Sequence, residues 1–169
     1  ALAGPAMASG VGRGDGAVYT LTNSASGNAV AVFERDRDGS LTARGTVATG
    51  GNGTGAGLGS QGALILDGNR LFAVNAGSNS VSLLHVDHRG KVRLADVDPS
   101  GGVRPISVTV HGKFVYVLNA GNATTPANIR GFLALWGKLV PLPGSTRPLS
   151  AAAPDPAQVE FSPNGRRLV

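Results

Sequence analysis

Cysteine is absent from the 169 residues, which excludes disulfide bonds, thiol nucleophiles and cysteine-ligated zinc. Aromatic residues make up only 5% of the chain. No hydrophobic run approaches the roughly 18 residues that a membrane-spanning helix needs. No window sustains the periodicity of an amphipathic helix either. The sequence therefore predicts an all-β chain without a membrane span.

The charge is modest and carries no strong signal for an anionic polymer. Fifteen Lys and Arg residues stand against ten Asp and Glu, a net charge of +5, and they are spread along the chain. Proteins that bind nucleic acid use clustered basic side chains and aromatic rings that stack on bases. Neither feature is present, so nucleic acid is not an expected partner.

The feature that dominates the sequence is a repeat, seen most clearly in residues 61–102. Four short runs rich in Val, Leu and Phe are separated by turns that contain Gly, Asn or Asp; the runs are residues 63–66, 71–75, 81–86 and 92–97. This pattern is typical of four short antiparallel strands joined by tight turns. One such sheet cannot bury both of its faces, so it needs neighbours of the same kind.

The repeat has a period of about 50 residues, which for four strands is the spacing of β-propeller blades. Equivalent turn residues recur at this spacing: Asn28, Asn79 and Asn128, and also Gly39, Gly90 and Gly137. The prediction is a partial β-propeller with about three four-stranded antiparallel blades and the start of a fourth. The blades are expected at residues 16–48, 61–102, 104–142 and 156–169, the first without an obvious first strand.

A closed propeller ring takes 4–8 blades, so this chain is expected to be part of a longer protein. The remaining blades of that protein would then be its partners. Residues 16–169 alone are expected to associate, because open blade faces and unpaired strand edges invite contact. The segment from Pro141 to Asp155, rich in proline, is expected to be a linker without strands.

Residues 1–15 are expected to be a flexible lead-in. Small residues at Ala6 and Ala8, with Ser9 following, fit the cleavage rule of a secretory signal peptide. On this interpretation the protein is secreted or periplasmic. The alternative is an ordinary disordered start rich in Ala and Gly.

No cofactor or metal is expected. Residues 57–62 match the dinucleotide pattern GxGxxG, but a β-type run follows in place of the helix that would hold a pyrophosphate. His85, Asp87 and His88 form the only close cluster of metal-type ligands. The two imidazoles would point to opposite faces of a strand, and no further ligand is near in sequence. The strand end is therefore interpreted as a solvated turn.

Candidate binding residues come from the geometry of blades, whose first strands line the central channel. Aligning those strands places Ser107 and Gln158 in one register near the strand entry. Two interpretations remain open for them: they face a ligand, or they satisfy backbone groups around the channel. Arg104, just before Pro105, adds a positive charge suited to a carboxylate or a phosphate.

Three segments resemble the lactonase-type seven-bladed propellers, a family that includes 6-phosphogluconolactonases and carboxymuconate-cyclising enzymes. They are residues 71–79 (LFAVNAGSN), 115–121 (YVLNAG after Val115) and 161–166 (FSPNGR). The resemblance covers residues 16–169 and implies a propeller that opens or forms lactones without a redox cofactor.

The resemblance also implies a catalytic position. Enzymes of the family often carry a His-Pro-His type sequence before the strand that begins here at Gln158. The corresponding residues are Asp155, Pro156 and Ala157, so both imidazoles are absent. Asp155, or a residue in the part of the ring that this sequence does not cover, would activate water. The leading hypothesis is hydrolysis of a small sugar or acidic lactone in the central channel. Arg104 would bind the anion, and Ser107 and Gln158 would orient the ring. The alternative is a non-catalytic, exported propeller that binds a ligand or a protein.

Overall fold

The computed structural model describes residues 16–149 and 155–169. These residues form strands, turns and loops without a helix, so the prediction of an all-β chain of antiparallel blades is confirmed. The lead-in at residues 1–15, where the sequence suggested the end of an export signal, lies outside the described residues. The strands are β1 (Gly16–Leu21), β2 (Ala29–Arg35), β3 (Leu41–Ala48), β4 (Leu64–Asp67), β5 (Arg70–Asn75), β6 (Ser80–Val86), β7 (Val92–Pro99), β8 (Pro105–His111), β9 (Phe114–Asn119), β10 (Asn128–Leu135), β11 (Lys138–Pro141) and β12 (Arg147–Pro148).

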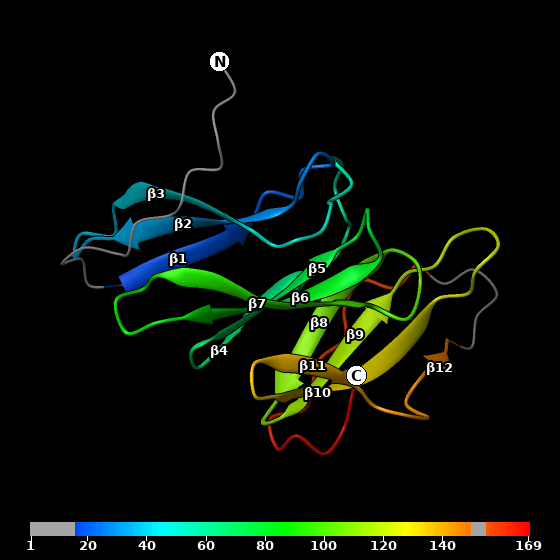
Figure 1. The fold of residues 1–169 in the computed structure, drawn as a ribbon. Coiled ribbons are helices and arrows are strands. Elements are labelled where there is room, and N and C mark those ends of the chain that lie inside the picture. The colour runs from blue at the N-terminus through cyan, green and yellow to red at the C-terminus, as the bar shows by residue number, and fades with distance from the viewer. Residues whose placement is uncertain (1–15, 150–154) are drawn as a thin grey trace.

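The strands build three antiparallel sheets that follow one another along the chain (Figure 1). The first sheet has the order β1-β2-β3, and the second has the order β4-β5-β6-β7. The third runs β11-β10-β9-β8, with β12 paired to β10. Sequential pairing of this kind is what tight turns between short strands produce. The first sheet has no fourth strand among the described residues, as the sequence pattern predicted.

One prediction about the third sheet is wrong. The segment from Pro141 to Asp155 was expected to contain no strand, yet Arg147 and Pro148 form β12 against Ile129 and Asn128. Proline lacks a backbone donor and is tolerated at a sheet edge, where that donor would face away from the ladder. A two-residue edge strand of this kind has no pattern that a sequence can reveal.

The second sheet lies between the other two and is buried on both faces. Leu71, Phe72, Ala73 and Val74 of β5 are each at most 1% exposed, which confirms the prediction from their continuous apolar run. Side chains on one face of this sheet pack against Val30 and Val32 of the first sheet. Those on the other face pack against the third sheet, in a cluster that includes Val108, Val115, Val117 and Phe132.

The apolar run of strand β9 is buried in the same way, except at Tyr116. Val115 and Leu118 are buried as expected, whereas Tyr116 is half-buried and meets the ring of Phe161 edge-on at 5.7 Å. Residues 155–169 lie beside β8 here. The backbone N–H of Phe161 donates to Thr109 Oγ1 at 3.1 Å, and Val159 enters a third apolar cluster with Leu118.

A buried amide ties the first sheet to the second. Asn75, fully buried at the end of β5, donates from Nδ2 to the hydroxyls of Ser80 and Ser82. Its Oδ1 accepts from Asn28 Nδ2 at 3.0 Å and from Thr49 Oγ1 at 2.7 Å. Thr49 begins the crossover to the second sheet. The network therefore fixes the crossover against the strand that it passes.

The same position recurs in the third sheet with fewer partners. Asn119 is also fully buried at a strand end, and its Nδ2 donates to Ser100 O and Asn128 Oδ1. Its Oδ1 is buried and accepts no hydrogen bond from the described residues. Asn28 and Asn79 precede β2 and β6 by one residue, whereas Asn128 is the first residue of β10. In the third sheet, the asparagine that marks the repeat therefore lies one residue later relative to the start of its strand.

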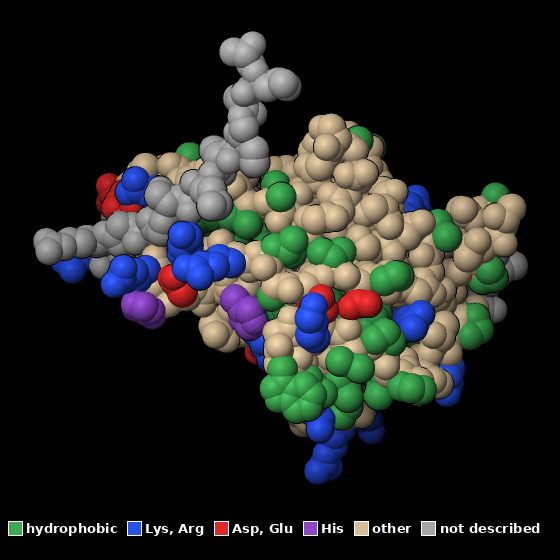
Figure 2. All heavy atoms as spheres, in the orientation of Figure 1, with side chains coloured by type: hydrophobic (Ala, Val, Ile, Leu, Met, Phe, Trp, Pro, Cys, Tyr) green, Lys and Arg blue, Asp and Glu red, His purple; other side chains and the backbone are tan. Residues whose placement is uncertain are grey.

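The face shown in Figure 2 carries charges of both signs without a single large basic or acidic field. Hydrophobic side chains gather over the end formed by β10 and β11, where Trp136 at the hairpin tip is 94% exposed. Among the described residues, no helix is long and apolar enough to cross a membrane.

Candidate functional site

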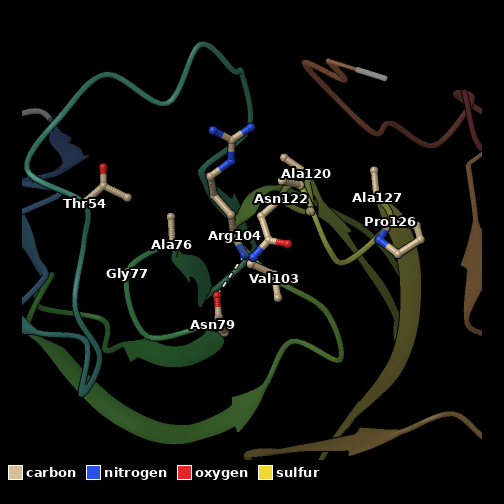
Figure 3. Close-up of a pocket in the computed structure, with 12 residues that line it drawn as sticks. Thr54, Ala76, Gly77, Asn79, Val103, Arg104, Ala120, Asn122, Pro126 and Ala127 are labelled. Atoms are coloured by element: carbon tan, nitrogen blue, oxygen red, sulfur yellow. Dashed lines mark hydrogen bonds between the residues drawn. The ribbon is translucent and has the colours of Figure 1, made fainter. Parts of the chain in front are cut away.

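Four connections meet at one end of the sheets and enclose a cavity of about 610 Å³. They are the β5–β6 and β9–β10 loops and the two crossovers from one sheet to the next (Figure 3). Thr54, Asn79, Arg104, Asn122 and Pro126 contribute to its wall. Loops of this kind carry binding sites on rigid scaffolds because they vary without disturbing the sheets beneath.

Arg104 is the charged residue of this wall, and its backbone is unusual. Its φ is 57°, in the left-handed region that costs an ordinary residue about 1–2 kcal/mol. Two hydrogen bonds hold it there: its N–H donates to Asn79 Oδ1 at 2.8 Å, and its carbonyl accepts from Ala120 N at 2.9 Å. The side chain rises from the crossover between Thr54 and Asn122 (Figure 3). Asn23, Asn79 and Trp136 also have a positive φ, but Arg104 is the one of these four with a charged side chain, and it lines the cavity.

The preceding crossover has a different backbone at the matching position. The N–H of Gly77 donates to Asn52 O there, as the N–H of Gly121 donates to Val103 O in the next repeat. This match places Gly53 where the next crossover has Arg104. Gly53 does not share the left-handed φ of Arg104, and a Cβ at Gly53 would lie 2.2 Å from the carbonyl carbon of Asn23. Only the second of the two crossovers therefore has room for a side chain at this position.

The structure brings Arg104 and Asp155 together. The distance between Arg104 Nη2 and Asp155 Oδ1 is 4.0 Å, with the two side chains 48% and 99% exposed. A contact this open to water contributes little to stability. It does place a negative group beside the positive side chain that lines the cavity, from segments 51 positions apart in the chain.

Ser107 and Gln158 do not join this pair. Ser107 is fully buried on β8, and its hydroxyl accepts a hydrogen bond from the backbone N–H of Val159 at 3.2 Å. Gln158 is exposed, donates to Glu160 Oε2 at 3.1 Å, and lines a separate cavity of about 310 Å³ with His111. In this structure the hydroxyl of Ser107 thus satisfies a backbone group.

Sequence reasoning missed the residue that supports Arg104. Asn79 was noted only as a marker of the repeat, yet its side chain accepts a hydrogen bond from the Arg104 backbone. A second amide that lines the cavity, Asn122, holds its own loop, because its Oδ1 accepts from the backbone N–H groups of Thr124 and Thr125. The available signal was an amide residue in each turn beside the cavity.

The His85, Asp87 and His88 cluster lies elsewhere and holds a turn. Asp87 Oδ1 accepts from the backbone N–H groups of Lys91 and Arg89, and these bonds lower the pKa of its carboxyl. Across residues 16–149 and 155–169, no three His, Cys, Asp or Glu side chains converge as a metal site would require.

A second ionised group joins the outer strands of two sheets. Asp96 on β7 accepts from Lys138 Nζ on β11 at 2.8 Å and from the backbone N–H of Leu139 at 2.8 Å. Burial raises the pKa of Asp96, but these hydrogen bonds and the Lys138 charge outweigh it, so the pKa is lowered. The pKa of the neighbouring Asp98 is raised, by burial first and then by the Asp96 charge. The Asp96–Lys138 ion pair joins the second sheet to the third and lies away from the cavity beside Arg104.

Solved structures resemble this arrangement. A crystal structure of a candidate 6-phosphogluconolactonase from Bacteroides uniformis aligns with a TM-score of 0.68 at 18% identity, over 92% of this chain and 47% of that one. A second candidate 6-phosphogluconolactonase, from Bacteroides fragilis, aligns with a TM-score of 0.53 at 14% identity, over 94% and 61%. The chain thus spans less than two thirds of either protein. These identities show the fold alone.

Sequence comparison gives the family. A search of curated proteins found no match. The family model described as lactonase, seven-bladed β-propeller, matches residues 15–126, which is well over half of the chain. This range includes the first two sheets, the Arg104 crossover and most of the loop around the cavity. The chain belongs to the lactonase family of seven-bladed β-propellers.

Proposed function

We propose that the cavity beside Arg104 binds a small sugar or acidic lactone and that the complete protein hydrolyses it. The observation that carries the proposal is the position of Arg104. Its guanidinium stands at the cavity in a backbone conformation that costs energy, with a carboxylate 4.0 Å away. The charge is particular to this crossover, because the preceding crossover has Gly53 at the matching position. A role in ligand binding accounts for both the strain and the charge.

Lactone hydrolysis needs one proton acceptor and one group that stabilises negative charge. In the proposed reaction Asp155 takes a proton from water as the water oxygen attacks the lactone carbonyl carbon. The carbonyl oxygen becomes an oxyanion, which the Arg104 guanidinium stabilises. The oxyanion then re-forms the carbonyl as the ring C–O bond breaks, the leaving alkoxide takes the proton back from Asp155, and the product is the open hydroxy acid. Ser107 has no part in these steps, because its hydroxyl is buried and engaged.

The proposal extends to the blades of the propeller ring that this chain does not include. The chain covers 47% and 61% of the two similar structures, so blades beyond residue 169 or before residue 1 would complete the cavity. We propose that they supply the remaining groups around the ligand.

A second candidate function is ligand binding without turnover. It is favoured by the 99% exposure of the Asp155 side chain, which is open to water on all sides. A general base works best when it is held close to its substrate in a site from which bulk water is excluded. On this alternative Asp155 serves only as a counter-ion to Arg104.

The two candidates separate in one experiment on the complete protein. A pH-stat assay on several lactones is run with Asp155→Asn, Arg104→Lys and Arg104→Gly. Hydrolysis by the parent that falls about 10²–10⁴-fold in Asp155→Asn, with folding intact, supports the base role. Hydrolysis that survives in Asp155→Asn refutes it. Absence of hydrolysis in the parent, with lactone binding that is lost in Arg104→Gly, leaves the binding function.

Arg104→Gly also tests whether the left-handed backbone of Arg104 lowers the stability of the protein. Glycine adopts a positive φ without steric cost, so the variant is expected to gain up to about 1 kcal/mol in the free energy of unfolding. A gain in stability with a loss of ligand binding is the combination expected of a functional residue. Loss of both would show that the arginine holds the crossover together.

A further inference from the structure

Asn79 holds the same place in the second sheet as Asn28 holds in the first. Asn79 precedes β6 by one residue, and Asn28 precedes the corresponding strand β2 by one residue. Both backbone carbonyls accept a hydrogen bond from the first residue of the next crossover, from Ser100 N–H at 2.9 Å and from Thr49 N–H at 3.0 Å respectively. The two asparagines therefore have matching backbone anchors, and their side chains can be compared directly.

The two side chains nevertheless have different partners. Asn28 Nδ2 donates across to the second sheet, to Asn75 Oδ1 at 3.0 Å and to Val74 O at 3.0 Å. Asn79 instead accepts: its Oδ1 receives the backbone N–H of Arg104 at 2.8 Å, the bond drawn as a dashed line in Figure 3. An amide that ties two sheets together in one repeat thus holds the crossover beside the cavity in the next.

The third sheet contains the acceptor that Asn79 leaves without a donor. Asn119 corresponds to Asn75 at the end of its strand, and its Oδ1 is buried and accepts no hydrogen bond from the described residues. The orientation of this amide is fixed, because its Nδ2 donates to the carbonyl of Ser100, which can only accept. A buried acceptor without a partner destabilises the folded state. A donor from Asn79 would remove that cost.

The side chain of Ser100 has turned in the same direction as that of Asn79. In the preceding crossover the hydroxyl of Thr49 is the second donor to Asn75 Oδ1, at 2.7 Å. The hydroxyl of Ser100, at the matching position, donates instead to the carbonyl of Gly102 at 3.3 Å. Both groups that would complete the buried network of the third sheet therefore face the crossover beside the cavity.

The crossover is also strained at Arg104. Asn79 and Arg104 have φ angles of 55° and 57°, whereas Asn28 lies outside the left-handed region. Asparagine tolerates this region better than arginine does, and a residue that precedes a proline, as Arg104 precedes Pro105, is normally extended. This state of the crossover therefore has two costs, the strained backbone and the unpaired oxygen of Asn119, and the Asn79 side chain is common to both.

We propose that Asn79 is the positioning residue of the cavity and that its side chain exchanges between two partners. In the state described here, Asn79 Oδ1 accepts from the Arg104 N–H and the guanidinium lines the cavity. In the second state Asn79 takes the backbone conformation of Asn28, and its Nδ2 donates to Asn119 Oδ1. Arg104 is then released from the left-handed region.

The exchange couples ligand binding to a buried hydrogen bond. An anionic ligand binds better to the state in which the guanidinium lines the cavity, so it shifts the population toward that state. Removal of the competing acceptor on Asn119 should shift the population in the same direction. The inference rests on the proposed function, because that function supplies the ligand at Arg104.

Three alanine variants of the complete protein test the exchange, with inorganic phosphate as the anionic probe in isothermal titration calorimetry. Asn79→Ala removes the acceptor that holds Arg104 and is expected to weaken phosphate binding by about tenfold. Asn119→Ala removes only the competing acceptor, so binding should be as tight as in the parent or tighter. Asn28→Ala is the matched control, because it removes the same side chain from a repeat in which the amide bonds to Asn75, and it should leave the affinity unchanged.

A measurement on the ligand-free protein reports the backbone directly. The left-handed φ of about +57° brings the amide proton and the Hα of one residue unusually close. Arg104 should therefore give a strong nuclear Overhauser effect between these two protons in arginine-labelled protein. The effect should weaken in Asn79→Ala, strengthen when phosphate is added to the parent, and stay strong in Asn119→Ala. A residue that served only for stability would not move this signal.

Equal losses of affinity in Asn79→Ala and Asn28→Ala, or in Asn79→Ala and Asn119→Ala, would overturn the proposal, because the amides would then act through stability alone. An unchanged Arg104 signal in Asn79→Ala would overturn it as well. A parent that does not bind phosphate, or phosphate binding that survives in Arg104→Gly, would overturn the coupling to a ligand. The proposed function fails separately: if the parent neither binds nor hydrolyses a lactone while the Arg104 signal still weakens in Asn79→Ala, the positioning role stands without that substrate.

Discussion

Asn75 and Asn119 occupy the same place in two successive sheets, and their replacement by alanine should have unequal effects. Both side chains are fully buried, and each replacement removes the same atoms. Asn75 makes four hydrogen bonds to side chains. Asn119 makes two, and its carbonyl oxygen is buried without a partner. The comparison therefore isolates the value of the polar network.

The magnitudes follow from the contacts. A net value of about 0.5–1.5 kcal/mol for each hydrogen bond gives about 2–6 kcal/mol for Asn75→Ala. The lower part of this range is expected, because Asn28 keeps its bond to Val74 O and Thr49 keeps its bond to Asn28 O. For Asn119→Ala the loss of two bonds is offset by removal of a buried unpaired acceptor, which itself costs about 1–3 kcal/mol. The net loss there should be close to zero before the shared cavity cost.

Urea denaturation of the two variants, followed by circular dichroism, measures the difference in the free energy of unfolding. Asn75→Ala should be less stable than Asn119→Ala by at least about 1–2 kcal/mol. The m-values should agree with that of the parent, so that the midpoints compare directly. Equal losses, or a larger loss at Asn119, would refute the argument that the Asn75 amide clamps the crossover.

Three further outcomes are expected. Val74→Asp should prevent folding, because an unpaired charge between two packed sheets costs several kcal/mol, and circular dichroism of the variant would show this. Ser107→Ala should cost about 1–3 kcal/mol, because the Val159 N–H loses its acceptor, and should leave the KM for a lactone unchanged. The lowered pKa of Asp96 contributes stability above its ordinary value of 3.8, and that contribution is lost as the pH falls through the lowered pKa. Lys138→Met should reduce this loss, as urea midpoints across the acid range would report.

The strands and their order could be predicted from the sequence because two local signals agree. Apolar runs such as Leu71–Val74 mark strands buried on both faces, and Asp67-Gly68 or Asp38-Gly39 mark the turns between them. Repetition at a spacing of about 50 residues then supplies the long-range information that a single blade lacks. β12 was not predicted, because its two residues are exposed at a sheet edge and have no apolar pattern.

Only part of the candidate site could be predicted from the sequence. Arg104 was selected for its charge and Asp155 through a family resemblance, and the structure brings the two within 4.0 Å. Ser107 was selected by register, but register along a strand does not reveal whether a neighbouring backbone takes the hydroxyl. Nor does it show the left-handed backbone of Arg104, which depends on Asn79 in another turn.

Comparison among the repeats decides which residues the fold explains. Each sheet solves the same packing problem, so a position that matches its counterparts needs no other reason for its identity. Arg104 stands where the preceding crossover has Gly53, and its left-handed backbone is not shared by that glycine. The Asn119 oxygen lacks the donors that the Asn75 oxygen receives. Packing of the sheets accounts for neither departure. Arg104 lies beside a cavity, and the same physical reasoning that explains the sheets therefore directs the search for function to that cavity.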